Sequence, residues 1–94
     1  IDDIIRGVVS CIESEALEKY ELLNIGNHRS EELMRLIEVI AQALRVTPKL
    51  ELLPMQPGDV PATYADIDKI RTKLGFSPTT AIEDGVPRFV RWYR

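Results

Sequence analysis

The stretch IDDIIRGVVSCIESEALEKYELLNIGN, residues 1–27, decides the expected fold class. Its apolar residues recur at helical spacing between residues 4 and 12, and the preceding Asp2 and Asp3 can cap the start of such a helix. Residues 20–25 form a mostly apolar run that is typical of a short, largely buried strand. Because a helix followed by a strand is typical of α/β units, we expect an α/β fold.

The firmest structural prediction is a second helix, from Ser30 to Arg45. Ser30 is a good capping residue, the first turn carries two glutamates and the last residue is basic, as the helix dipole prefers. The apolar residues surround most of the helix circumference, which implies burial on more than one side. Because the rest of a 94-residue chain is too small to bury all of this apolar surface, we expect the chain to self-associate through this helix.

Two more helices are expected towards the C-terminus. One runs between Asp66, a capping residue, and Gly75, a C-terminal stop. The other begins at Thr80, where the sequence has the spacing of a capping box. Pro87 would remove a hydrogen bond from this helix and crowd its preceding turn, so we expect a kink there or a late start near Gly85.

Extended structure is also expected in the middle of the chain. Residues 49–53 and 62–65 are short strand candidates, separated by a loop in which three prolines and one glycine fix the path of the backbone. The predicted fold is therefore α/β, with about four helices and two or three short strands.

Composition and charge exclude several classes of protein. The chain has room for one small domain, and a net charge of −3 with a pI near 5.1 gives no basic surface for nucleic acid. No run approaches the roughly 18 apolar residues of a membrane span, and the single cysteine, Cys11, is expected to be a reduced core thiol. We therefore expect a cytoplasmic protein with no nucleic-acid or membrane partner. Ile1 in place of methionine indicates a fragment or a processed product.

Few residues in the chain are suited to catalysis or metal binding. One histidine and one cysteine cannot build a metal site, so none is expected. His28 is interpreted as a solvated or capping residue, and the pair Asp2-Asp3 as a helix start in preference to an acid/base pair. Residues 24–27, Asn-Ile-Gly-Asn, could contact a ligand at the end of a strand, or they could only make the turn into the second helix. The sequence does not decide between these two roles.

The loop from Leu53 to Asp66 is the strongest candidate for a binding site. Its prolines and glycine fix its path, and it places Gln56, Asp59 and Tyr64 along that path. Rigid loops that present polar groups are typical of binding sites. From the residues alone, a binding loop and a purely structural loop both stay open.

Several motifs in fixed order carry a resemblance to a known family. They are IDDI (1–4), NIGN (24–27), LPMQPGDVPATYAD (53–66), LGFSPTT (74–80) and GVPRFVRWY (85–93). Together they resemble the final quarter or so of extended short-chain dehydrogenase/reductase enzymes, and most closely UDP-glucuronate 4-epimerases. The resemblance covers essentially the whole chain, and the long central motif is its most specific part.

The resemblance implies a parent enzyme with two domains. Such an epimerase binds NAD on a Rossmann domain and a UDP-sugar against a smaller C-terminal domain, and it interconverts UDP-glucuronate and UDP-galacturonate by transient oxidation at C4. By resemblance, residues 1–29 belong to the edge of the Rossmann sheet and residues 30–94 to the sugar-nucleotide domain. The parent is expected to be a homodimer.

The resemblance also assigns roles to two residues of the central loop. In related epimerases the matching loop reads Arg-Pro-Gly-Asp, its arginine contacting the diphosphate and its aspartate the uridine ribose. Asp59 takes the ribose role by resemblance, and Gln56 stands at the arginine position as a neutral donor that can hydrogen-bond a phosphate without a charged contact. These two are the expected substrate-binding residues.

The chain lacks the residues that catalysis in this family needs. The Gly-rich NAD-binding turn is absent, and no tyrosine has a lysine at the fourth following position, since Tyr20 is followed there by Asn24 and Tyr64 by Asp68. We expect no catalytic or cofactor-binding residue here, no cofactor bound to this piece, and no activity of the piece alone.

Two alternatives stay open. The chain could be a small helical interaction module that binds a protein partner through the helix near residues 31–45, without any nucleotide. It could also belong to another nucleotide-sugar-modifying member of the same superfamily, such as a decarboxylase or a dehydratase.

Overall fold

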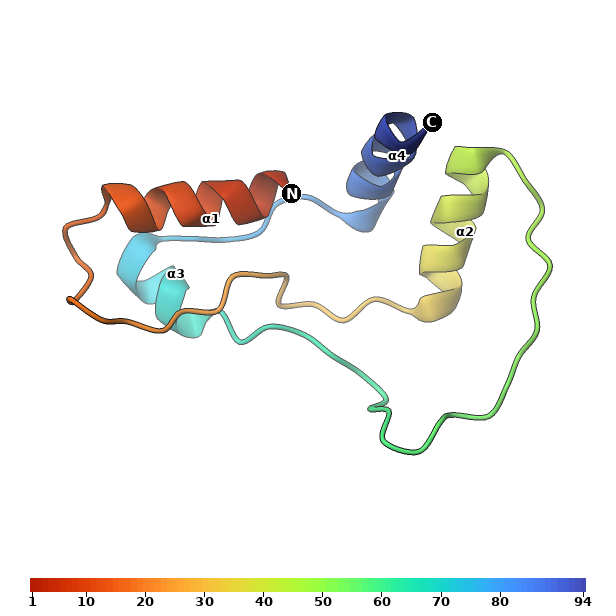
Figure 1. The fold of residues 1–94 in the computed structure, drawn as a ribbon, viewed down its shortest axis with the longest axis horizontal. Coiled ribbons are helices and arrows are strands. Elements are labelled where there is room, and N and C mark those ends of the chain that lie inside the picture. The colour runs from red at the N-terminus through yellow and green to blue at the C-terminus, as the bar shows by residue number, and fades with distance from the viewer. The chain divides into compact units, whose positions relative to one another are not determined.

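The computed structural model describes residues 1–94 and contains four helices and no strand (Figure 1). The helices are α1 (Asp2–Glu13), α2 (Leu33–Leu44), α3 (Asp68–Leu74) and α4 (Ile82–Tyr93). All four lie close to where the sequence pattern predicted them. The predicted α/β fold class is nevertheless wrong, because the structure is all-helical. None of these helices is long and apolar enough to cross a membrane.

The predicted strands do not form because none has a pairing partner. Residues 20–25, 49–53 and 62–65 have strand-like patterns but no regular secondary structure. A strand is stabilised by a ladder of backbone hydrogen bonds to a neighbouring strand. The backbone N–H of Ala65 donates to the C=O of Asn27 at 3.0 Å, and this isolated bond is not extended into a ladder. Residues 20–25 are therefore an extended segment that packs through its side chains.

The chain divides into two compact units. Unit 1 consists of residues 1–30 and 63–80, and unit 2 of residues 31–62 and 81–94. Both units combine segments that are distant in sequence, so each is closed by non-local contacts. The assignment of residues 1–29 and 30–94 to two domains of a parent enzyme is a different division and stays a prediction.

Unit 1 has a small apolar core on α3. Ile67 and Ile70 are fully enclosed and Phe76 is nearly so, and half-buried apolar side chains from α1 and from the extended segment pack around them. Gly7 lies on the buried face of α1, where a Cβ atom would come within 2.9 Å of Ile25 Cγ2. The absence of a side chain at Gly7 therefore allows α1 to approach this core closely.

Polar contacts of Asp3 join the start of α1 to the end of unit 1. The Asp3 carboxylate accepts hydrogen bonds from the backbone N–H groups of Thr79 and Thr80, at 3.1 and 3.0 Å, and from the Arg6 guanidinium at 2.6 Å. Arg6 also donates to the C=O of Ser77 at 2.9 Å. The predicted side-chain cap of α1 by Asp2 or Asp3 is wrong, because Ile1 is the N-cap residue and no side chain makes a cap hydrogen bond. The Asp3 carboxylate instead binds the Arg6 side chain and the distant backbone of Thr79 and Thr80.

Two other predicted caps are also wrong. Helix α2 begins at Leu33, after Glu32, and makes no side-chain cap bond, so Ser30 lies outside the helix. Helix α4 begins after Ala81 without a side-chain cap, and the N–H of Thr80, which Glu83 would bond in a capping box, is bonded to Asp3. The Asp3 carboxylate and the Thr80 N–H bind each other across the fold, which local sequence does not reveal.

The C-terminal stop of α3 is confirmed at Gly75. Its φ of 65° lies in the left-handed region that favours glycine, and its N–H donates to the C=O of Arg71 at 2.8 Å. In α4, by contrast, the helix continues through Pro87, so the predicted late start near Gly85 does not occur. The missing N–H of Pro87 removes one helical bond, to the C=O of Glu83, while α4 keeps its packing in unit 2.

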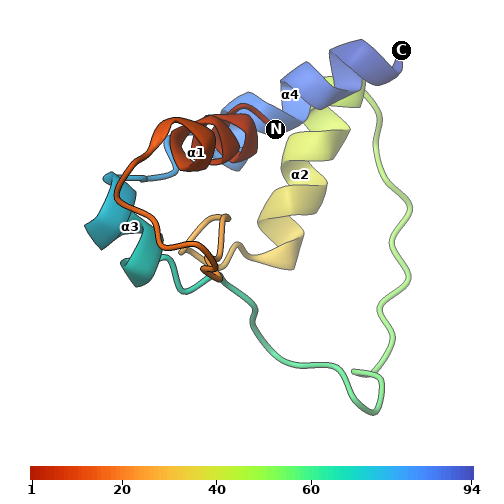
Figure 2. The same cartoon turned by 60° about the vertical axis from the view of Figure 1, so that its left-hand side comes forward.

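Unit 2 is built on the pair α2 and α4, which lie side by side (Figures 1 and 2). Val39 and Ala41 of α2 and Val90 of α4 are its buried apolar residues. A guanidinium also links the two helices, since Arg35 donates through Nε to Glu83 Oε1 at 3.0 Å. The rest of the unit, residues 45–62, is an irregular segment without helix or strand.

Candidate functional site

The central loop contains a tight turn at Gln56-Pro57-Gly58-Asp59. The backbone N–H of Asp59 donates to the C=O of Gln56 at 3.1 Å, which closes a four-residue β-turn. Proline stands at the second position, where its fixed φ is suited to a turn, and Gly58 at the third position has a φ of 94°. This arrangement is that of a type II turn, which requires a positive φ at the third position.

The turn presents Gln56 and Asp59 at its two ends. The first and last residues of a β-turn lie within about 7 Å of each other, measured between Cα atoms. Both side chains are exposed, and neither has a hydrogen bond or ion pair in the chain. The turn therefore brings together an amide, which can donate and accept, and a carboxylate, which accepts only. Both groups are free to bind a ligand.

The segment around this turn is apolar as well as exposed. Leu53, Met55 and Val60 flank the turn, and each has more than half of its surface exposed. Exposed large apolar side chains that gather on one segment often mark a surface that another molecule or another part of a protein covers. Tyr64, the third polar candidate of the loop, belongs to unit 1 and is also exposed.

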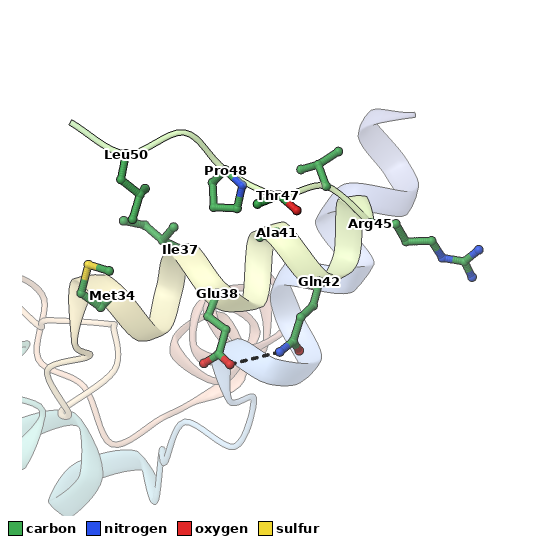
Figure 3. Close-up of a pocket in the computed structure, with 10 residues that line it drawn as sticks. Met34, Ile37, Glu38, Ala41, Gln42, Arg45, Thr47, Pro48 and Leu50 are labelled. Atoms are coloured by element: carbon green, nitrogen blue, oxygen red, sulfur yellow. Dashed lines mark hydrogen bonds between the residues drawn. The ribbon is translucent and has the colours of Figure 1, made fainter.

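A pocket of about 420 Å³ lies in unit 2, between α2 and the segment that follows it (Figure 3). Its apolar floor consists of side chains from one face of α2, and Pro48 and Leu50 cover it from the returning chain. Its polar rim includes Glu38, which accepts a hydrogen bond from Gln42 Nε2 at 3.3 Å. Neither Gln56 nor Asp59 lines this pocket, so the two predicted site residues lie elsewhere in the unit.

The pocket exists because the chain reverses direction at Arg45. Arg45 has a φ of 58°, and it ends α2 by donating its N–H to the C=O of Gln42, while the N–H of Val46 donates to the C=O of Ala41, each at 3.1 Å. These two bonds form a Schellman motif with arginine in the position usually occupied by glycine. Sequence reasoning missed the pocket, since an arginine gives no signal for a left-handed backbone.

Three charged side chains of unit 2, Arg35, Glu38 and Glu83, are paired with one another, and the pair Arg35–Glu83 joins α2 to α4. The pKa of Arg35 is raised first by its hydrogen bond to Glu38, with Nη1 and Oε2 2.6 Å apart, and then by its hydrogen bond to Glu83. The pKa of Glu83 is lowered first by a hydrogen bond from its own backbone N–H and then by Arg35. Because these groups are paired with each other, their arrangement indicates a structural role.

The remaining candidates from the sequence lie in unit 1. Asn24 donates through Nδ2 to the C=O of Asp66 at 3.1 Å, and Asn27 Oδ1 accepts the N–H of Arg29 at 2.9 Å, so both asparagines take part in loop structure. The Nδ1 atom of His28 is enclosed and has no hydrogen-bond partner. Cys11 is half-buried against the core of the unit. No group of three or more histidine, cysteine or acidic residues lies where it could hold a metal ion.

Comparison with known proteins gives clear similarities over most of the chain. An uncharacterised protein of Methanocaldococcus jannaschii is 40% identical over 93 residues, which is 99% of this chain and 28% of that protein. A probable UDP-glucuronate 4-epimerase of Rhizobium meliloti is 39% identical over 74 residues, covering 79% of this chain and 22% of that protein. UDP-glucuronate 4-epimerase 1 of Arabidopsis thaliana is 32% identical over 105 aligned residues, covering 99% of this chain and 24% of that protein.

These matches fall in the C-terminal part of longer proteins. The chain spans about a quarter of the length of the curated relatives it matches. No protein-family model matches the chain.

Proposed function

We propose, on the premise that this chain is related to the C-terminal part of UDP-glucuronate 4-epimerases, that it forms the UDP-sugar-binding side of such an enzyme. The complete enzyme would use NAD to interconvert UDP-glucuronate and UDP-galacturonate by transient oxidation at C4 of the sugar. We further propose that it is a cytoplasmic homodimer, with residues 1–29 at the edge of its Rossmann sheet and residues 30–94 in its sugar-nucleotide domain.

The observation that carries this proposal is the turn at residues 56–59. It holds an amide and a carboxylate close together, exposed and without partners in the chain. The Asp59 carboxylate has two oxygens that can accept hydrogen bonds from the neighbouring hydroxyls of a ribose. Gln56 can donate from its amide to an oxygen of the diphosphate, although it brings no positive charge. In a nucleoside diphosphate, the ribose hydroxyls and the diphosphate oxygens lie a few ångströms apart, which suits a turn of this size.

The 94 residues do not fit an NAD site. Such a site needs a glycine-rich turn between a strand and a helix, and the structure has no strand. The glycines with a positive φ serve other purposes, since Gly58 forms the exposed turn and Gly75 ends α3. The cofactor and the acid/base residues would therefore belong to the part of the enzyme outside this chain. The contribution of the chain would be to bind and orient the nucleotide.

The direct test is a titration of the chain with UDP, followed by backbone amide shifts in NMR. We expect the shifts to concentrate at residues 55–60. Asp59→Ala should weaken binding by roughly tenfold or more, because a hydrogen bond to a charged group contributes about 1.5–3 kcal/mol. Glu51→Ala is the matched control, since it removes one exposed negative charge from the same segment. Equal weakening by both variants, or shifts away from the turn, would contradict the proposed role of Asp59.

A further inference from the structure

Three large aromatic side chains are exposed near the end of α4. Phe89 is 60% exposed, Trp92 79% and Tyr93 74%. Their rings pack against one another, with centroids 5.8 Å apart for Phe89 and Trp92 and 6.2 Å apart for Phe89 and Tyr93. The three rings therefore form one continuous apolar surface, which we call the aromatic patch. Exposed apolar surface of this kind marks a place where another molecule docks.

An apolar groove of about 310 Å³ adjoins the aromatic patch in unit 2, between α2 and α4. Helix α2 contributes Ile40 and Leu44 to one wall, and α4 forms the other wall. Phe89 and Tyr93 of the aromatic patch also line this groove. Patch and groove are thus parts of one docking surface that offers almost no polar group to a ligand.

One face of α4 is shaped to fit an inverted copy of itself. Gly85, Phe89 and Trp92 are four and then three residues apart, so they lie on the same face of the helix. Gly85 has no side chain and leaves room at one end of this face, whereas the exposed Trp92 projects at the other end. When two such helices run in opposite directions and cross near Phe89, Trp92 of each copy lies over Gly85 of the other.

The charges of α4 favour the same antiparallel arrangement. Its first turn carries Glu83 and Asp84, and its last turn carries Arg91. Asp84 and Arg91 are exposed, and neither has a side-chain partner in the chain. An antiparallel copy brings Asp84 of one chain near Arg91 of the other, twice in a symmetric dimer, and it also opposes the two helix dipoles. A parallel copy would place like charges together.

The area of this surface is suited to a weak dimer. Aromatic side chains bury about 150–250 Å² each, so covering the patch removes roughly 400 Å² of surface from water on each copy. That is about half of the 800 Å² per partner that a standard interface buries. The groove walls add to it, but the interface stays small. We therefore expect a dissociation constant on the order of 10–100 μM.

We infer that a second copy of this chain docks on α4, in a symmetric antiparallel dimer centred on the aromatic patch. The inference rests on the homodimer of the proposed function and deepens it, because it names the surface and the direction of the partner helix. It also differs from self-association through the helix near residues 31–45, since α2 contributes only a wall of the groove.

Sedimentation equilibrium of the 94-residue chain, at concentrations from about 5 to 500 μM, tests whether this dimer forms. The mass should rise from 10.7 kDa towards twice that value. Trp92 is the only tryptophan in the chain, so its fluorescence reports on the patch alone, and its emission should shift to shorter wavelength as the dimer forms. A monomer at every concentration, or a dimer without this shift, would overturn the inference.

Trp92→Ala and Tyr20→Ala form a matched pair of variants. Each removes an exposed aromatic side chain, 79% and 87% exposed respectively, but Tyr20 belongs to unit 1 and is no part of the patch. Trp92→Ala should weaken the dimer roughly tenfold or more, because tryptophans at the centre of an interface are frequent hot spots. Tyr20→Ala should leave it unchanged. Equal weakening by both variants would contradict docking on α4.

Asp84→Arg and Arg91→Asp test the direction of the partner helix. Each alone brings like charges together in the antiparallel dimer and should weaken it several-fold, whereas the double variant restores opposite charges and should recover most of the affinity. Circular dichroism checks that α4 stays helical in each variant, since both reversals oppose the helix dipole. Single variants that dimerise as tightly as the unaltered chain would contradict the antiparallel arrangement.

Titration of the same samples with UDP separates this inference from the proposed function. A monomeric chain in which UDP shifts the amides of residues 55–60 would overturn the dimer alone. A dimer that binds no UDP would overturn the proposed nucleotide site and leave the docking surface on α4 supported.

Discussion

Replacing Gly7 by alanine tests how unit 1 is packed. Gly7 is buried in α1, and an added Cβ would lie 2.9 Å from Ile25 Cγ2, 3.2 Å from Phe76 Cε2 and 3.3 Å from Ile25 Cδ1. The shortest of these distances is well below an ordinary carbon–carbon contact of about 3.5–4.0 Å. Ile25 cannot easily give way, because a β-branched side chain is restricted at χ1. Either α1 or the extended segment would have to move.

The expected net effect is a loss of about 1–2 kcal/mol in the free energy of unfolding. Alanine favours a helix interior over glycine by about 1 kcal/mol, which by itself would stabilise α1. Inserting a methyl group into a filled core costs about 1–3 kcal/mol, and the 2.9 Å approach places Gly7 towards the upper part of that range. The steric cost therefore outweighs the gain in helix propensity.

Urea denaturation followed by circular dichroism measures this change, and Ile25→Ala provides its control. Ile25→Ala removes both of the Ile25 atoms that the new methyl group would meet. In that background Gly7→Ala should be neutral or stabilising, and the double-mutant cycle should give a clear coupling energy between the two positions. A stabilisation of about 1 kcal/mol by Gly7→Ala in the unaltered chain would refute the close packing of α1 on Ile25.

Two more predictions concern the stability of unit 1. Gly75→Ala should destabilise the chain by about 1–2 kcal/mol in the same urea assay. The space around Gly75 is open, but its φ of 65° strains any residue that has a Cβ. An unchanged urea midpoint would argue against a left-handed backbone at the end of α3. The pKa of Glu21 is lowered, first by a hydrogen bond from Lys73. Burial alone would raise the pKa of Asp3, but hydrogen bonds from the backbone of Thr80 and Thr79 and the charge of Arg6 lower it overall. Since both carboxyl groups have a lower pKa in the folded chain, their stabilisation should be complete above the unfolded pKa values and be lost as the pH falls through the folded values. Glu21→Gln should reduce this acid sensitivity in a pH series of unfolding curves, and an identical pH profile would count against the ion pair.

The sequence predicted the elements that depend on local interactions. Helical periodicity placed all four helices, and Gly75 marked the end of α3, because a helix satisfies its own backbone and its end needs only one permissive residue. A rigid loop was expected in this part of the chain for the same reason, and its proline and glycine set the backbone angles of the turn at residues 56–59 directly.

Features that depend on distant residues were predicted poorly. A strand pattern such as residues 49–53 indicates what a segment can do, but pairing needs a second strand, and this chain has none. Asp3 has the position of a helix cap, yet it binds Thr79 and Thr80, more than 70 residues away in sequence. The pocket over α2 depends on the left-handed backbone of Arg45, which the residue type does not indicate. The binding roles of the turn residues stay a prediction.

The most direct test of the central proposal is the steady-state kinetics of the longer protein that contains this chain, with UDP-glucuronate as substrate and NAD present. UDP-galacturonate should accumulate to equilibrium without release of carbon dioxide. Asp59→Ala should raise the KM for UDP-glucuronate by roughly tenfold or more, while Glu51→Ala should leave it unchanged. Loss of carbon dioxide, no formation of UDP-galacturonate, or an unchanged KM in the Asp59 variant would contradict the central proposal.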